Sequence, residues 1–276
     1  MPVAPSVGPW DQELAVARAA AEAAAAVFPP PGAAPAAERK PDGSPVTATD
    51  LAANARILAV LRTAFPADAI LSEELADEPA RLRAHRVWIV DPLDGTRDFI
   101  AGSGDYAVHV ALAVEGVPVV AVVAWPAEDA IYTAVRGGGA WRHDAAGSHA
   151  LKVAAARPLA AYRTGITRTA MHPALQRFLE RGGLAGAAVP RGASIKHLLL
   201  AAGALDCCVT LHGGEHEWDT AAPGLIVTEA GGTVTDADGV PFRYNQPDVG
   251  HRRGVLLSAG HHHAALAALA RECWPS

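Results

Sequence analysis

Two aspartates lie three positions apart in the sequence DPLDGT, residues 91–96, directly after an apolar run. The run predicts a strand that ends at Asp91, and the proline then turns the chain so that Asp91 and Asp94 can face one point. The amides of Gly95 and Thr96 can point at an anion, because glycine permits a close backbone approach. Carboxylates together with phosphate oxygens are the usual ligands of Mg²⁺. The same residue types also make tight turns without a ligand, so this pattern alone leaves both interpretations open.

Three further acidic sites have structural explanations when each is taken alone. Glu73 and Glu74 follow a short strand candidate, where adjacent acids usually lie in solvent, although a cation would remove their mutual repulsion. Asp50 and Thr47 fit a helix capping box. Asp219 begins an apolar helix, where an N-cap is equally expected. None of these acids is decisive by itself.

Lysine is rare in this chain, so a retained lysine draws attention. Lys196 lies in the first turn of a predicted helix, where its charge opposes the helix dipole. A second phosphate bound by Lys196, with Ser194 beside it, would relieve that conflict. The alternative is an ordinary surface lysine.

Histidines near these segments are interpreted more cautiously. His109 lies in an alternating strand and is interpreted as structural. His212 and His216 flank the turn before Asp219, and their role in lining a pocket is left open.

The elements that would position these residues differ between the two halves of the chain. The first half predicts an α+β unit, residues 1–155, and the second an α/β unit, residues 156–276. The expected helices are residues 11–27, a helix that begins near 47–50 and ends before 65–66, 173–181, 194–203, 219–230 and 262–273. The expected strands are 69–72, 86–90, an antiparallel meander at 106–114, 117–124, 131–135 and 140–142, and then 162–166, 205–211 and 254–258; residues 28–46 are expected to form a loop.

Composition narrows the class of protein. The 276 residues contain 23 Lys+Arg and 29 Asp+Glu, a formal net charge of −6, which argues against a binder of nucleic-acid polymers. No apolar run approaches the roughly 18 residues of a membrane helix, and no signal peptide or membrane partner is expected. Three cysteines without CxxC spacing predict a reduced, cytoplasmic chain. No GxGxxG motif follows a strand, so dinucleotide binding is disfavoured.

Taken together, the motifs resemble the inositol monophosphatase-like, lithium-sensitive, metal-dependent phosphatases. The match spans roughly residues 10 to 270 with every motif in order, and it comprises VTATD at 46–50, the acid pair at 73–74, DPLDGT at 91–96, WDTAA at 218–222 and EAGG at 229–232. Within that family the chain looks most like the 3'(2'),5'-bisphosphate nucleotidase branch, through RDFI at 97–100, GDYAVHV at 104–110, GASIK at 192–196 and PFRYN at 241–245. It departs from that branch at Ala193, Asp98 and Asp105, and residues 212–218 lack a basic residue that some members have.

The resemblance implies a layered α-β-α-β-α sandwich and a site for two to three Mg²⁺ ions. By this resemblance Glu73, Asp91 and the Leu93 carbonyl would hold the first ion, and Asp91, Asp94 and Asp219 the second. A third, more weakly bound ion and its water would be placed by two of the acids, Asp50 and Glu73. The same resemblance assigns catalysis to Asp50, Glu73 and Thr96, and substrate binding to Gly95, Thr96, Ser194, Lys196 and Asp219.

The implied reaction is removal of the 3'-phosphate of 3'-phosphoadenosine 5'-phosphate, and of 3'-phosphoadenylyl sulfate as a further substrate, by water that the metal activates. The implied partner is a small phosphorylated molecule, a nucleotide. A homodimer and inhibition by Li⁺ are expected on the same ground. The alternatives are an inositol monophosphatase, a broad sugar-phosphate phosphatase that acts on fructose 1,6-bisphosphate, or a protein without activity that uses its acids for Ca²⁺ or for capping.

Overall fold

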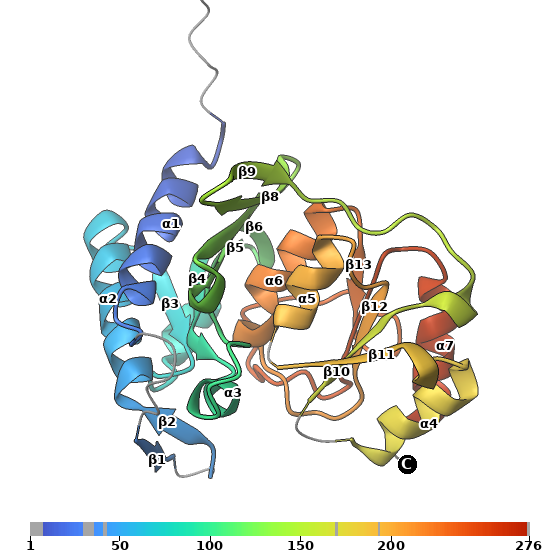
Figure 1. Cartoon of the computed structure of the whole chain (residues 1–276). Coiled ribbons are helices and arrows are strands. Elements are labelled where there is room, and N and C mark those ends of the chain that lie inside the picture. Colours follow the sequence, from blue (N-terminus) through green and yellow to red (C-terminus); the bar gives the residue numbers. More distant parts are fainter. Residues whose placement is uncertain (1–7, 30–35, 41–42, 169–170, 193, 275–276) are drawn as a thin grey trace, which may run out of the picture.

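Helices and sheets alternate in five layers in the computed structural model, which describes residues 8–29, 36–40, 43–168, 171–192 and 194–274 (Figure 1). The layers are the helix pair α1 and α2, a seven-stranded sheet, the pair α5 and α6, a five-stranded sheet, and the pair α4 and α7. This arrangement confirms the predicted sandwich.

The first sheet has the strand order β3-β4-β5-β6-β7-β8-β9 and is antiparallel except for the parallel pair β3–β4. The second has the order β11-β10-β12-β14-β13 and is mixed. The helices are α1 (Asp11–Ala25), α2 (Ala48–Ala64), α3 (Thr96–Ile100), α4 (Pro173–Gly182), α5 (Ile195–Ala201), α6 (Glu217–Glu229) and α7 (His263–Cys273). The strands are β1 (Ala37–Arg39), β2 (Pro45–Thr47), β3 (Ala69–Ser72), β4 (Arg86–Asp94), β5 (Ala107–Val114), β6 (Val117–Trp125), β7 (Ala130–Val135), β8 (Gly139–Asp144), β9 (Gly147–Ala150), β10 (Thr164–Thr167), β11 (Ala188–Arg191), β12 (Cys207–Thr210), β13 (Thr233–Thr235) and β14 (Val255–Ser258).

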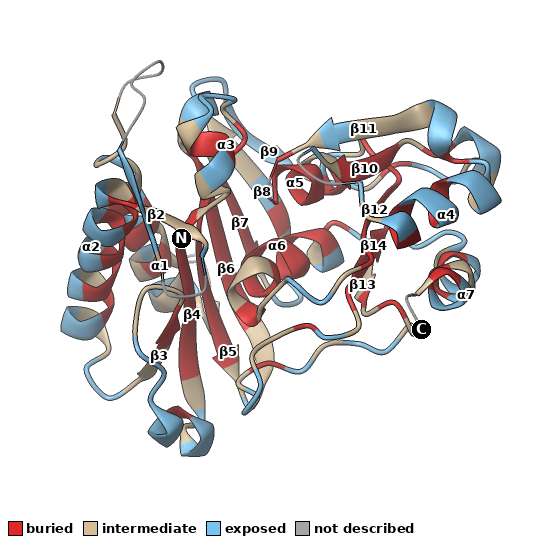
Figure 2. Ribbon diagram, turned by 90° about the horizontal axis from the view of Figure 1, so that it is seen from below, coloured by how far each residue is buried: buried red, intermediate tan, exposed pale blue. Residues whose placement is uncertain are grey.

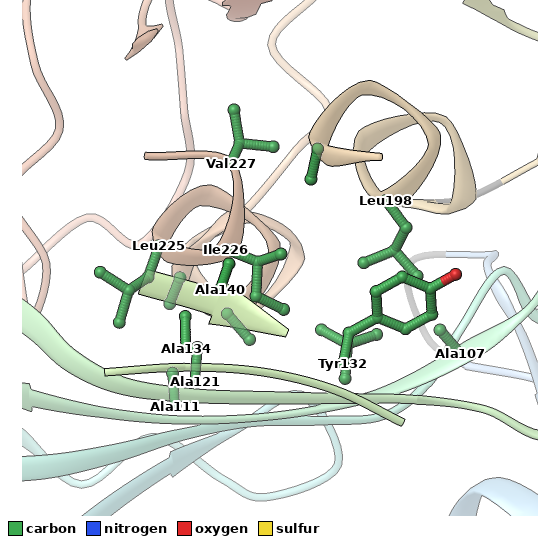
Figure 3. Close-up of a cluster of buried hydrophobic side chains, with 14 of the residues drawn as sticks. Ala107, Ala111, Ala121, Tyr132, Ala134, Ala140, Leu198, Leu225, Ile226 and Val227 are labelled. Carbon is green, nitrogen blue, oxygen red and sulfur yellow. The ribbon is translucent and has the colours of Figure 1, made fainter. Parts of the chain in front are cut away.

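The face of the first sheet toward α6 is built mainly from small side chains. Alternate residues of the strands point to one face of a sheet, and those toward α6 include Ala107, Ala111, Ala121, Ala134 and Ala140. Leu198 of α5 and Leu225, Ile226 and Val227 of α6 supply large side chains at this contact, and Tyr132 supplies one from the sheet (Figure 3). The alanines of the sheet allow α6 to pack closely, which brings its first turn near the end of β4.

On the opposite face of the sheet the strands carry the larger side chains and the covering helix carries the small ones. The sheet presents Val90, Val110, Leu112 and Val122 there, and α1 meets them with alanines. Figure 2 shows that the exposed residues of α2 lie on the side away from the sheet. Because both faces are covered, these antiparallel strands read as nearly continuous apolar runs.

Most of the elements expected from the sequence are present; the differences are in short strands, in the end of β4, and in the five-residue helix α3, which was not predicted. Residues 28–46 were expected to be a loop, but β1 and β2 pair there; residues 30–35 and 41–42 of that segment lie outside the described residues. The prediction that a strand ends before Asp91 is wrong, because β4 continues to Asp94 through an irregularity. β9, β11 and β13 were not predicted, and they are only three or four residues long.

Residues 151–163 connect the two sheets, but the largest buried cluster takes residues from both sides of this connection. The division into units 1–155 and 156–276 therefore stays a prediction. Among the described helices, none combines the length and the apolar character needed to cross a bilayer.

We expect the tight contact between α1 and the sheet to make Ala20 intolerant of a larger side chain. Ala20 is completely buried, whereas Ala19, its neighbour on the same helix, is exposed. The change Ala20→Leu should lower the free energy of unfolding by about 1–3 kcal/mol, since it overpacks a filled contact. The change Ala19→Leu should shift it by less than about 0.5 kcal/mol. Urea unfolding of both variants tests this, and equal stabilities would contradict the packing argument.

Candidate functional site

An extra residue in β4 sets the geometry of the first two aspartates. Asp91 pairs with His109 of β5, whereas Asp94 pairs with Ala107, so three steps along β4 correspond to two along β5. Such a bulge bends a strand and redirects its side chains. The carboxylate of Asp91 accepts the Leu93 amide at 3.0 Å, which closes the turn. Gly95 follows with a φ of +87°, a conformation that other residues rarely adopt.

Asp91, Asp94 and Asp219 converge although they come from the two halves of the chain. One oxygen from each lies within 4.8 Å of the others. Asp219 reaches this point from the first turn of α6, where it also accepts the amide of His216 as part of a capping box. Capping and convergence, left as alternatives by the sequence, therefore occur together.

The chemistry of this trio fits a divalent cation. Oδ2 of Asp91 is buried and accepts no hydrogen bond from the described residues. Burial, with the charges of Glu73, Asp94 and Asp219, raises the pKa of Asp91 well above its usual value. Burial and neighbouring acids also raise the pKa of Asp219 to about 7, against the lowering effect of its hydrogen bond with His216. A cation would relieve the burial penalty and the repulsion, because it favours the charged carboxylates.

Glu73 lies next to this trio and is held by a lysine. Its amide donates to the carbonyl of Val90 at 3.2 Å, one residue before Asp91. Lys40 Nζ lies 2.7 Å from Glu73 Oε1 and 2.5 Å from Glu74 Oε1. Burial lowers the pKa of Lys40, but its bonds to the two glutamates outweigh this and raise the pKa above its usual value. For the carboxyl of Glu74, burial has the opposite effect and raises the pKa.

Asp50 and Thr96 also come together. Asp50 accepts the Thr47 amide at 2.8 Å in the predicted capping box. Its other oxygen lies 3.2 Å from the Thr96 hydroxyl, which is also 3.2 Å from the Leu93 carbonyl. The hydroxyl of Thr96 therefore links the start of α2 to the turn that carries Asp94.

Ser194 approaches the trio from the start of α5. Its amide donates to Asp94 Oδ2 at 2.6 Å, and its hydroxyl lies 2.7 Å from His109 Nε2. Ser194 and Lys196 are both almost completely buried, at 2% and 3% exposure. The hydroxyl of Ser194 thus bonds to a buried side chain of the protein, and its role in substrate binding stays a prediction.

Two contributors were missed by the sequence interpretation. The first is His109, which contacts Asp94 and Ser194. The sequence feature that could have indicated this role is that His109 is the only polar residue in the β5 sequence AVHVALAV. The second is buried Arg81, which donates to Asn245 at 2.8 Å, while Glu217 accepts the Asn245 amide at 2.6 Å. This chain of bonds fixes the first turn of α6, and nothing in the spacing of its members indicated it.

The two histidines left open lie on different sides of the turn before α6. His216 stacks on Trp218, with ring centroids 4.7 Å apart and an interplanar angle of 8°. Its Nδ1 lies 3.7 Å from Asp219 Oδ2. His212 lies beside His172, with ring centroids 6.1 Å apart.

The sequence pattern of the inositol monophosphatase family matches residues 9–274. CysQ of Escherichia coli, a 3'(2'),5'-bisphosphate nucleotidase, is 36% identical over 208 residues, which are 74% of this chain and 81% of the relative. The 3'-phosphoadenosine 5'-phosphate phosphatase of Mycobacterium tuberculosis is 40% identical over 209 residues, 73% of each chain.

Solved structures agree with the sequence relatives. CysQ of Bacteroides thetaiotaomicron has a TM-score of 0.76 at 28% identity and covers 91% of this chain and 98% of its own. The inositol monophosphatase of Thermotoga maritima has a TM-score of 0.78 at 25% identity, with coverage of 95% and 96%. The chain therefore belongs to the inositol monophosphatase family of phosphatases.

Proposed function

We propose that this protein is a Mg²⁺-dependent phosphatase that removes the 3'-phosphate of 3'-phosphoadenosine 5'-phosphate. The chemistry rests on the convergence of Asp91, Asp94 and Asp219, together with a buried oxygen of Asp91 that accepts no hydrogen bond from the described residues. The substrate is inferred from the sequence relatives, whose names specify that nucleotide or its class. An inositol phosphate is the second candidate, because a solved inositol monophosphatase has the same fold at 25% identity.

Two or three ions fit the acids of this site. Glu73, Asp91 and the Leu93 carbonyl would hold the first, and Asp91, Asp94 and Asp219 the second. The third would lie near Asp50 and Glu73, after the Lys40 ammonium leaves Glu73. When bound, the ions neutralise phosphate charge and lower the pKa of water.

The residues around these ions supply orientation and a proton acceptor. The Thr96 hydroxyl can donate its proton to Asp50 or to the Leu93 carbonyl, which leaves its oxygen free to accept a hydrogen bond from the attacking water. Asp50 would then take the proton that water releases, at Oδ1. The amides of Gly95 and Thr96 would bind phosphate oxygens.

We assign recognition of the second phosphate to Lys196, with Ser194 beside it. The amide and hydroxyl of Ser194 are engaged with Asp94 and His109. Lys196 lies in the first turn of α5, is itself almost completely buried, and carries the charge that a second phosphate requires. A homodimer, a cytoplasmic location and inhibition by Li⁺ stay predictions.

The substrate assignment is tested by the relative turnover of three phosphate esters. We expect kcat/KM for 3'-phosphoadenosine 5'-phosphate to exceed that for inositol 1-phosphate and fructose 1,6-bisphosphate by at least about tenfold, a difference of about 1.4 kcal/mol. Phosphate release from each compound at saturating Mg²⁺ gives the comparison. Equal or faster turnover of inositol 1-phosphate would reject the nucleotide assignment and favour the second candidate.

The metal assignment is tested by Asp94→Asn, which removes one charge of the trio but keeps an oxygen that can accept the Ser194 amide. We expect a fall in kcat of about a hundredfold or more, as for the loss of one preorganised electrostatic contact. Without metal the variant should melt no lower than the parent, because one like charge is gone, and it should lose part of the stabilisation that Mg²⁺ gives.

Glu272→Gln removes an exposed carboxylate of α7 and serves as the control for Asp94→Asn. It should leave activity and the stabilisation by Mg²⁺ unchanged. Full activity in Asp94→Asn would reject the role of the trio.

Cation affinity should depend on pH because the pKa of Asp219 is raised to about 7 by burial and neighbouring acids. Below pH 7 a cation must displace a proton from this carboxylate, so affinity should fall as pH falls, by up to about tenfold per unit. Calorimetric titration with Mn²⁺ at pH 8, 7 and 6 measures this. A dissociation constant that stays the same from pH 8 to pH 6 would contradict the raised pKa of Asp219.

A further inference from the structure

His109 occupies a place in the first sheet that joins three segments of the site. It is 0% exposed, and the backbone of β5 sets it directly opposite Asp91 of β4. Residues opposite each other in an antiparallel pair point to the same face, here the face toward α6. The side chain therefore lies where α5, α6 and the end of β4 meet.

The hydrogen bonds of His109 define its tautomer. Nδ1 lies 3.0 Å from the Trp218 carbonyl, which can only accept, so this nitrogen carries the proton. In the neutral ring Nε2 then accepts the hydroxyl of Ser194 at 2.7 Å. The protons are assigned from these partners, as is usual for imidazoles.

Each partner of His109 adjoins a different aspartate of the trio. Ser194, held by Nε2, donates its amide to Asp94 Oδ2 at 2.6 Å, and Nε2 itself lies 3.4 Å from that oxygen. Trp218, held by Nδ1, directly precedes Asp219. One imidazole thus fixes the approach of two acids that belong to different halves of the chain.

We propose that His109 is a positioning residue that sets the separation of the Asp94 and Asp219 carboxylates and so the cation affinity of the site. The proposal rests on the proposed function, since it concerns the same trio. Repulsion within the trio favours spreading of the carboxylates, and the two bonds of His109 oppose this. Residues that hydrogen-bond to metal ligands and so orient them typically contribute 10- to 100-fold to metal affinity.

Three substitutions separate the two bonds. His109→Asn places an amide near the position of Nδ1 and can keep the bond to Trp218. His109→Gln reaches the position of Nε2 and can keep the bond to Ser194. His109→Phe fills the space and loses both. We expect cation affinity to fall 10- to 100-fold in His109→Phe and less in the two amide variants.

The readouts are calorimetric titration with Mn²⁺, the Mg²⁺ dependence of activity, KM for the nucleotide at saturating Mg²⁺, and urea unfolding in the absence of metal. KM for the nucleotide should change less than threefold, because His109 is completely enclosed, whereas the Mg²⁺ concentration that gives half-maximal activity should rise 10- to 100-fold in His109→Phe. Loss of a merely structural histidine would lower stability without changing cation affinity.

His263 offers a matched control. Like His109, it makes two hydrogen bonds through its ring, here with the hydroxyls of Thr235 at 2.9 Å and Ser258 at 2.8 Å. These residues lie on the far side of the second sheet. His263→Phe should lower stability and leave Mn²⁺ affinity unchanged. Parental Mn²⁺ affinity in folded His109→Phe would overturn the proposal.

If His109→Phe does not fold, His109→Gln, Ser194→Ala and their double variant replace it. Ser194→Ala removes the hydroxyl but keeps the amide that contacts Asp94. The combined loss of Mn²⁺ affinity should be smaller than the product of the single losses, because both changes act on one bond. Two single variants with parental affinity would also overturn the proposal. Mn²⁺ binding does not depend on the substrate, so failure of the nucleotide assay alone would reject the proposed function and leave this comparison valid.

Discussion

Like charges brought together at a buried point are the constraint on which the rest of this structure depends. Unit charges about 4 Å apart repel by about 4 kcal/mol at an effective dielectric constant near 20, a large part of the 5–15 kcal/mol that stabilises a typical protein. The raised pKa values of Asp91 and Asp219 reflect first the cost of burial and then this repulsion. The fold must therefore hold the acids in place where their own interactions would separate them.

The position of α6 supplies most of that restraint. The helix lies between two sheets, and the alanine-rich face of the first sheet lets it approach closely (Figure 3). Glu217 in its first turn is fixed through Asn245 to Arg81, a residue that follows Glu73 and Glu74 in the chain. His109 adds a bond to the carbonyl of Trp218. Packing fixes the axis of the helix, and these polar contacts fix the height of Asp219 along it.

The longer helices and strands could be predicted from periodicity and the candidate acids from motifs that are local in the chain, whereas the layered sandwich followed from the resemblance of those motifs to a known family. The bulge at Asp91 could not be predicted, since it is defined by pairing with His109 on another strand. Strands β11 and β13 carry too few residues for a recognisable alternation. The link from Ser194 to Asp94 joins residues a hundred positions apart, and no pattern within either segment encodes it.

The acids of the site divide into two groups that differ in how their charge is met. The ammonium of Lys40 already contacts Glu73 and Glu74, so the protein itself offsets one of the two negative charges of this pair. Asp94 and Asp219 instead contact His109 and His216, and an imidazole carries charge only when it is protonated. Oδ2 of Asp91 accepts nothing from the described residues. The demand for an external cation is therefore greatest at the trio, and occupation near Glu73 requires the additional step of displacing Lys40.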